Sequence, residues 1–279
     1  MKISVIIPSY KPQAYLQKCL DSIYNQSFPK EDFEVILVLN GCSEPYNGLI
    51  REYMAVHPDV QWNYIQTDQR GVSNARNIAL DASKGDYITF IDDDDYVSPS
   101  YLEELYDKAD RNTVSLCYPM SIEDKSGEIL PFYITADYVK WSRKGSVEFY
   151  KPRRYFNGPV YKLIHKDIIG NRRYDVHFRI GEDLIFMFLI SDRFNNVAFT
   201  SKDAVYYRRF RENSATAKQY TIREILSIAA AKINTLSKIY FSGKRYKFIF
   251  FFTMVRGTLF ALMTSIFKRI RYSVTRSGL

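Results

Sequence analysis

Four consecutive aspartates, residues 92–95, are the side chains whose type and spacing most clearly indicate chemistry. They follow an apolar run, residues 87–91, that is typical of a buried β-strand. Two carboxylates about 4 Å apart repel each other by roughly 4 kcal/mol at an effective dielectric constant of about 20, and a bound cation removes this repulsion. Oxygen ligands favour Mg²⁺ or Mn²⁺, and Mg²⁺ usually shares its coordination with substrate phosphates. The alternative is a solvated acidic turn ahead of a helix that begins near Ser98.

The elements that would position these aspartates are indicated by residues 1–120, which alternate short apolar runs with helical patterns. This alternation is typical of βαβ units and predicts an α/β fold with a mostly parallel sheet. The predicted strands are residues 3–7, 34–39, 62–66, 87–91 and 114–117, the first of them stopped by Pro8. The predicted helices begin near Pro12, Val72 and Ser98, and the second ends near Ser83.

Polar groups directly follow three of these strands. Pro8, Ser9 and Tyr10 follow the first strand, Asn40 follows the second, and the four aspartates follow the fourth. Ligands of open α/β sheets bind beyond the carboxyl ends of the strands. We therefore expect a ligand site at this edge of the sheet.

Residues 120–205 are irregular in pattern and rich in aromatic side chains. We expect loops and short strands packed around the site. Within residues 132–161, Trp141, Phe156 and Tyr161 are candidates for contact with sugar faces, although core packing is the expected role of most of these aromatics.

Charge is distributed unevenly along the 279 residues, whose formal net charge is +8. After Glu224 the chain has ten lysines and arginines and no acidic residue. We predict two regions, a ligand-binding and acceptor domain over residues 1–220 and a helical, basic extension over residues 221–279.

Apolar residues recur at helical spacing over residues 248–267 of this extension. A transmembrane helix would place Arg256 near the bilayer centre, at about 2.5–3.5 kcal/mol. An interfacial helix avoids this penalty, and its basic residues favour anionic headgroups. We expect an anionic membrane surface as a partner. A helix packed on the protein and an oligomer contact are the alternatives, and nucleic acid is not an expected partner because no recognised motif is present.

The three cysteines are an odd number and form no C-x-x-C pair, which favours a reducing compartment over a disulfide framework. The three histidines match no zinc spacing. The apolar run that precedes Pro8 is too short for a signal peptide. We expect a cytoplasmic protein, peripheral at the inner face of the plasma membrane.

Five segments, in order, resemble the family 2 glycosyltransferases, which have the GT-A fold. They are residues 4–10, 34–43, 71–77, 85–95 and 181–186. The resemblance implies a doubly wound, mostly parallel sheet with helices on both faces. It also implies an inverting hexosyltransferase that moves a sugar from a nucleotide-sugar donor, expected to be a UDP-sugar, to a glycan or lipid-linked acceptor in surface polysaccharide synthesis.

The same resemblance assigns the donor site. Pro8, Ser9 and Tyr10 would line the base and ribose, with Tyr10 against the uracil. Asn40 and Leu39 stand where the family often has two aspartates. The amide of Asn40 can still accept a hydrogen bond from the uracil N3–H.

Asp92 and Asp94 fit the family's D-x-D pattern, which implies a Mn²⁺ or Mg²⁺ cofactor. Asp94 is the expected direct ligand, Asp92 or Asp93 would lie near the ribose and metal, and Asp95 would brace the loop. Arg76 would either bind the diphosphate or form an ion pair within the domain.

The Glu-Asp pair of the family matches Glu182 and Asp183. We assign Asp183 as the base that takes the proton of the acceptor hydroxyl, with Glu182 orienting it or the acceptor. The alternative is that both acids merely begin a helix, where they suit its positive end. Further on, Arg208 and Arg211 would close over the diphosphate, and a solvated basic strand is the alternative.

Two other functions remain open at this point. A sugar nucleotidyltransferase shares a similar sheet and acidic site, but it would have a glycine-rich basic loop where this chain has Ser9 and Tyr10. A noncatalytic nucleotide-sugar-binding membrane scaffold is suggested by the altered Leu39 and Asn40.

Overall fold

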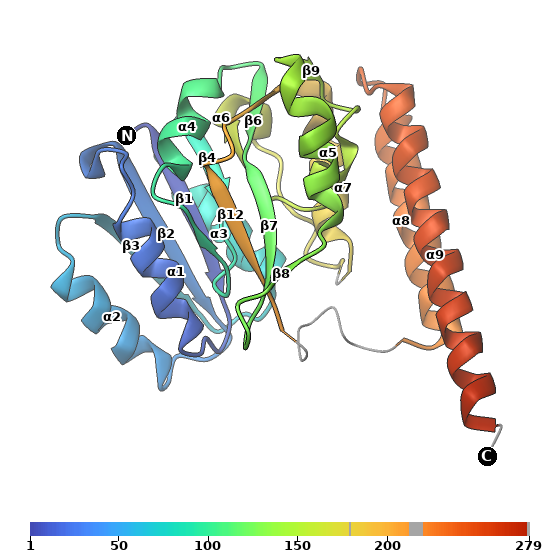
Figure 1. Ribbon diagram of the computed structural model, residues 1–279, viewed down its shortest axis with the longest axis horizontal. Helices are drawn as coiled ribbons and strands as arrows, with labels where there is room; N and C mark the ends of the chain where they lie inside the picture. The colour runs from blue at the N-terminus through green and yellow to red at the C-terminus, as the bar shows by residue number, and fades with distance from the viewer. Residues whose placement is uncertain (179, 212–219, 278–279) are drawn as a thin grey trace. The chain divides into compact units, whose positions relative to one another are not determined.

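The structure is a computed structural model and describes residues 1–178, 180–211 and 220–277 (Figure 1). The chain divides into two units, Met1–Arg211 and Glu212–Leu279. This boundary lies upstream of the predicted one after residue 220. The last two residues of the predicted extension, 278–279, lie outside the described residues.

An eight-stranded sheet with the order β3-β2-β1-β4-β10-β6-β11-β9 organises the first unit. Its strands are β1 (Ile3–Ser9), β2 (Phe33–Asn40), β3 (Gln61–Thr67), β4 (Tyr87–Phe90), β6 (Thr113–Leu116), β9 (Val147–Glu148), β10 (Lys162–His165) and β11 (Asn196–Phe199). Strands β1 to β4 pair in parallel, as do β6 and β11, whereas β10 and β9 run antiparallel to their neighbours. The prediction of a mostly parallel α/β sheet is confirmed.

Helices flank this sheet (Figure 1). The α-helices are α1 (Tyr15–Tyr24), α2 (Tyr46–Val56), α3 (Val72–Ala82), α4 (Tyr101–Lys108), α5 (Tyr133–Trp141), α6 (Lys166–Ile169) and α7 (Glu182–Ile190). Short 3₁₀ turns are η1 (Lys30–Asp32), η2 (Ser142–Lys144), η3 (Arg153–Asn157) and η4 (Ser191–Arg193). Helix α3 packs on β1 and β2, and α4 packs on β6, β10 and β11.

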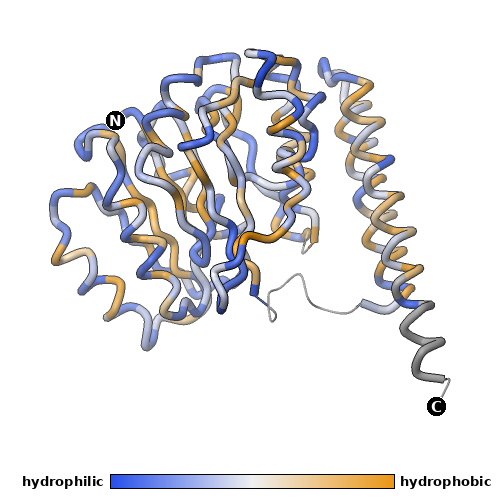
Figure 2. Tube along the Cα trace, in the orientation of Figure 1, coloured by the Kyte–Doolittle hydropathy of each residue, from blue (hydrophilic) through white to orange (hydrophobic). Residues whose placement is uncertain are grey.

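The core of this unit lies along the central strands. Every residue of β1 and β2 is buried, and their apolar runs are continuous rather than alternating (Figure 2). Parallel strands that are covered on both faces have this pattern. Gly85 allows a close approach at the start of β4, because a Cβ there would lie 2.5 Å from the backbone nitrogen of Ser4.

The end of β1 and the starts of α1 and α4 differ from the predictions, and α1 begins at Tyr15 rather than near Pro12. Strand β1 continues through Pro8 to Ser9, because pairing with β4 ends at Ile6 and Pro8 therefore has a strand neighbour on one side only. Helix α4 begins at Tyr101 rather than at Ser98. The Ser98 hydroxyl instead accepts from the backbone nitrogen of Val205 at 2.8 Å, so it is used in packing against a distant strand.

A second sheet, with the order β5-β12-β7-β8, is absent from the predictions made from sequence. Its strands are β5 (Tyr96–Val97), β7 (Tyr118–Glu123), β8 (Ile129–Leu130) and β12 (Val205–Phe210). Pairing of β12 with β5 brings the strand and the residue after it, Arg211, beside the four aspartates of residues 92–95. In the aromatic stretch, Phe156 and Tyr161 are buried and Trp141 is half-buried, so core packing is the role of the first two.

The second unit contains two long helices, α8 (Ile222–Tyr240) and α9 (Phe248–Ser277). The predicted basic extension is therefore helical. A capping box of Thr221 and Glu224 begins α8. The helices pack on each other, with the rings of Tyr240 and Phe251 stacked at 4.5 Å. By length and composition, the segment Phe248–Phe267 is able to cross a membrane, with a mean hydropathy of 1.7.

Candidate active site

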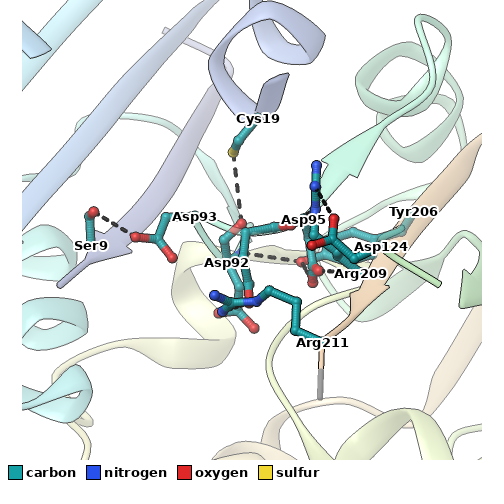
Figure 3. A network of polar contacts seen from close by, with 10 residues as sticks. Ser9, Cys19, Asp92, Asp93, Asp95, Asp124, Tyr206, Arg209 and Arg211 are labelled. Carbon is teal, nitrogen blue, oxygen red and sulfur yellow. Dashed lines mark hydrogen bonds and ion pairs between the residues drawn. The ribbon is translucent and has the colours of Figure 1, made fainter. Parts of the chain in front are cut away.

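The acidic loop, residues 92–95, connects β4 to β5 at the carboxyl end of the sheet (Figure 3). Asp95 is buried, and its carboxylate accepts hydrogen bonds from the Tyr206 hydroxyl at 2.8 Å and from the Arg209 backbone nitrogen at 2.8 Å. The Tyr206 oxygen also accepts from the backbone nitrogen of Asp92 at 3.1 Å. Asp95 therefore braces the loop, as predicted, and leaves the other three carboxylates for other partners.

Ser9 ties the end of β1 to this loop. Its hydroxyl donates to Asp93 at 2.6 Å, and burial raises the pKa of Asp93 to about 7, with this hydrogen bond opposing the rise. Asn40 is buried; its Nδ2 donates to the carbonyl of Ser9 at 2.7 Å and its Oδ1 accepts from the nitrogen of Gly71 at 3.0 Å. Pro8 is buried as well. This geometry favours a positioning role for Asn40 over direct contact with a base.

Asp94 forms an ion pair with Arg211, whose guanidinium lies 4.5 Å from the ring centroid of Tyr15. Burial raises the pKa of Asp94, the charge of Asp92 adds to the rise, and Arg211 opposes it. Arg209 holds the same segment, because its Nε donates to the carbonyl of Asp94 at 3.0 Å. Arg211 therefore lies at the acidic loop, where a diphosphate would bring further negative charge.

The arginine pair predicted from sequence, Arg208 and Arg211, is split by the alternation of strand β12. The guanidinium of Arg208 lies 5.7 Å from the ring centroid of Phe132 and, among the described residues, forms no hydrogen bond or ion pair with the acidic loop. Arg209, which the sequence analysis missed, contacts that loop and pairs with Asp124. The period of two along a strand is the signal that groups Arg209 with Arg211.

Arg76 joins the acidic loop to the predicted base. It is buried on α3, and its Nη1 donates to Asp183 at 2.6 Å while its Nη2 donates to Asp92 at 3.0 Å. Of the two roles left open for Arg76, the structure supports the ion pair within the domain. One guanidinium thus fixes the distance between a carboxylate of the loop and the carboxylate on α7.

Asp183 lies in the first turn of α7, after Gly181 in the left-handed conformation. Its side chain is 26% exposed, so it has an open side despite its contact with Arg76. Burial raises the pKa of Asp183 to about 6; Arg76 opposes this rise, and the charges of Glu182 and Asp92 add to it. A carboxylate with this pKa is deprotonated at neutral pH and is still basic enough to take a proton.

Tyr10 lies just beyond β1 and is 41% exposed. The guanidinium of Arg70 lies 5.5 Å from its ring centroid and the ammonium of Lys11 lies 5.7 Å from it. Gly41 permits this arrangement, because its φ is +89° and a Cβ there would lie 2.5 Å from Arg70 Cγ. The contact of Tyr10 with a base stays a prediction.

The acidic loop has oxygen donors suited to a divalent cation. The side chains of Asp92 and Asp94 are 39% and 21% exposed, although each has an arginine partner. Within the described ranges, no group of three His, Cys, Asp or Glu is placed to hold a metal ion. Two carboxylates completed by phosphate oxygens match the way in which Mg²⁺ is usually bound. These residues therefore fit a cation that binds together with a nucleotide diphosphate.

The chain is similar to known proteins both in sequence and in structure. The chain is 30% identical over 220 residues to the minor teichoic acid biosynthesis protein GgaB of Bacillus subtilis, covering 77% of this chain but only 24% of that protein. The crystal structure of Staphylococcus aureus TarS 1-349 in complex with UDP-GlcNAc superposes with a TM-score of 0.70 at 20% identity, covering 93% of this chain and 72% of that one.

The mannosyltransferase PcManGT of Pyrobaculum calidifontis, in complex with GDP-Man and Mn²⁺, superposes with a TM-score of 0.62 at 17% identity and covers 95% of this chain and 73% of that one. At these identities, both structures show a shared fold. The family model "Glycosyl transferase family 2" matches residues 4–188. Because this match spans the greater part of the sequence, the chain belongs to glycosyl transferase family 2.

Proposed function

We propose that this chain is an inverting glycosyltransferase of the hexosyltransferase type that uses a UDP-sugar. Its acceptor is a glycan or a lipid-linked glycan in surface polysaccharide synthesis. The observation that carries the proposal is the pairing of Arg76 with both Asp92 and Asp183, since it joins the donor loop to a carboxylate able to act as base. The names of GgaB and of the TarS complex support a surface glycan and a UDP-sugar.

The residues of this chain divide the reaction between them. Asp183 takes the proton of the acceptor hydroxyl as its oxygen bonds to the anomeric carbon, and the bond from that carbon to the diphosphate breaks. Glu182 orients Asp183 or the acceptor, and Arg211 lies where it can contact the diphosphate. Asp92 and Asp94 would hold Mn²⁺ or Mg²⁺, which as a Lewis acid neutralises the charge of the leaving group.

The donor is tested with a thermal-shift panel of nucleotide sugars, each with Mn²⁺ and with EDTA. We expect a UDP-sugar with Mn²⁺ to raise the melting temperature by several degrees, because a ligand at 100 times its Kd stabilises the folded state by about 2.7 kcal/mol. An equal shift in EDTA would remove the metal from donor binding. Binding of a UDP-sugar without any release of UDP would favour the noncatalytic scaffold.

We also propose that the second unit binds the cytoplasmic face of an anionic membrane. Four of the exposed apolar side chains of α9 lie along one line, the α9 stripe: Phe248, Phe252, Leu259 and Met263. Ile249, Phe260 and Phe267 are exposed next to it. Phe250 and Met254, which are buried, lie on the opposite side of α9. Arg256 is exposed beside the stripe, and a long basic side chain can reach the headgroups while its stem covers apolar surface.

Sedimentation with phosphatidylglycerol vesicles tests this surface. We expect the protein to sediment with them and to be released by salt, since exposed charges are screened. Phe252→Glu and Leu259→Glu should each weaken binding by at least about tenfold, because each removes an apolar side chain worth about 1.5–3 kcal/mol. Leu226→Glu, on α8, is the matched control. Equal binding of wild type and the stripe variants would place the contact elsewhere.

A further inference from the structure

Lys162 is a buried cation for which the reaction described above has no role. It is the first residue of β10, its exposed fraction is 0%, and β10 lies between β4 and β6 in the central sheet. In the described part of the chain, no carboxylate lies within ion-pair distance of its ammonium group. Its Nζ instead donates to the carbonyls of Gly158 and Val160, each at 2.6 Å. The side chain therefore turns back and fastens the segment that precedes its own strand.

That segment, residues 158–161, has a strained backbone. Tyr161 has φ of +72°, which is unfavourable for a residue with a side chain. Such a conformation persists where the surrounding contacts fix it. The two hydrogen bonds from Lys162 lie directly before Tyr161, and the Tyr161 carbonyl accepts from the nitrogen of Cys117 at 3.1 Å. Tyr161 is thus fixed on both sides.

The strained residue supports the acidic loop. The ring of Tyr161 is buried and meets the ring of Tyr206 edge-on, with centroids 4.6 Å apart and planes at 79°. Tyr206 is the residue whose hydroxyl binds Asp95 and the backbone nitrogen of Asp92. A shift of Tyr161 would therefore move the group that fixes both ends of the acidic loop.

The same segment also adjoins the helix that carries Asp183. Residue 158 directly follows η3, and η3 packs against α7. The segment 158–161 thus contacts Tyr206, which holds the acidic loop, and directly follows η3, which packs against the helix that carries Asp183. Residues 158–161 are the connection between η3 and β10, and the two hydrogen bonds from Lys162 fasten this connection.

We propose that Lys162 is a positioning residue for metal and donor binding, acting through the 158–161 segment, Tyr161 and Tyr206 on the acidic loop. The proposal rests on the proposed function, because its readout is binding of UDP with Mn²⁺. Hydrogen bonding is the essential property of Lys162. Burial lowers the pKa of Lys162 to about 7, and a neutral amine still has the two N–H donors that the carbonyls of Gly158 and Val160 need.

The test measures how the affinity for UDP depends on Mn²⁺, by calorimetry on the full chain. We expect Lys162→Met, which keeps the length of the side chain and removes its donors, to raise the Mn²⁺ concentration for half-maximal UDP binding. The expected rise is about 10- to 100-fold, the usual effect of losing an outer partner of a metal site. Binding of UDP in EDTA should change less than twofold, because Lys162 acts on the metal loop.

A second pair of variants keeps the test decisive if Lys162→Met does not fold. Tyr161→Gly accepts the positive φ and removes the ring, so it should fold and show the same rise in the Mn²⁺ concentration for half-maximal UDP binding. Tyr161→Phe keeps the ring contact, so its Mn²⁺ concentration for half-maximal UDP binding should equal that of the wild-type protein. Asp192→Asn, which breaks the buried ion pair with Arg172, is the control for simple destabilisation and should leave UDP binding unchanged.

Outcomes for the two proposals differ. Wild-type protein that binds no UDP under any condition would overturn the proposed function and this inference with it. Wild-type binding that depends on Mn²⁺, together with an unchanged Mn²⁺ requirement in Tyr161→Gly, would overturn the role of Lys162 alone. Equal losses in EDTA and in Mn²⁺ would also overturn it, since they indicate a general loss of structure.

Discussion

Asp183→Asn is expected to lower the rate of sugar transfer by about 10²- to 10⁴-fold, the usual contribution of a general base, while UDP-sugar binding in Mn²⁺ persists. The asparagine keeps an oxygen that can accept from Arg76, so the bridge to the acidic loop is retained and only the basic group is lost. Release of UDP from the donor measures the rate, and calorimetry measures binding. Normal turnover by this variant would remove Asp183 from the mechanism.

The pH profile of the wild-type protein provides an independent check. With a pKa raised to about 6, Asp183 is protonated below that pH and is then unable to accept the acceptor proton. The rate under saturating substrate should fall about tenfold per unit below pH 6 and be level above it. Glu182→Gln, at the neighbouring acid, is the matched control. We expect it to lower the transfer rate less than Asp183→Asn does and to leave the shape of the pH profile unchanged.

Asp94→Ala is expected to remove the Mn²⁺-dependent part of UDP binding. A direct ligand should matter more than an outer partner, so we expect the loss to exceed about 100-fold. UDP binding by titration in Mn²⁺ and in EDTA separates the metal-dependent part from the rest. Because Asp94 also pairs with Arg211, its removal frees that arginine, which makes the comparison in EDTA necessary.

Two further variants serve as comparisons for Asp94→Ala. Arg211→Met should weaken UDP binding with and without Mn²⁺, because in the proposed site the charge of Arg211 would act on the diphosphate itself. Asp81→Asn, which breaks an exposed ion pair with Arg173, is the control and should leave UDP binding unchanged both with and without Mn²⁺. If Asp94→Ala retains the full Mn²⁺ dependence, the metal is held by other groups and the assignment of Asp94 fails.

The elements of the first 120 residues are predictable from sequence because their signals are local. Strands β1 and β2 have continuous apolar runs, β3 and β4 have shorter apolar or aromatic patterns, and polar residues mark the points at which β1, β2 and β4 end. Residues 92–95 were therefore placed correctly at the edge of the sheet. The second sheet has no such local signal, since β5 and β8 have two residues each and depend on pairing with distant strands.

The candidate site was predictable only in part for the same reason. The resemblance indicated Asp183 and Arg76, but their contact spans 107 positions and no spacing in the sequence encodes it. Asn40 was assigned to the base, whereas its amide is used between Ser9 and Gly71. Arg209 was missed because its role depends on which face of β12 meets the acidic loop, and the pairing of β12 with β5 was not predicted.

The position of β10 has a consequence for the order in which this protein can be assembled. Strands β3, β2, β1 and β4 are complete once the ribosome has made residue 90, but the strand that pairs with the free edge of β4 begins at Lys162. The nascent chain therefore presents an unpaired edge strand while residues 91–161, about a third of the first unit, are being made. Such edges are templates for aggregation, so truncation ahead of β10 should yield an insoluble fragment rather than a smaller folded domain.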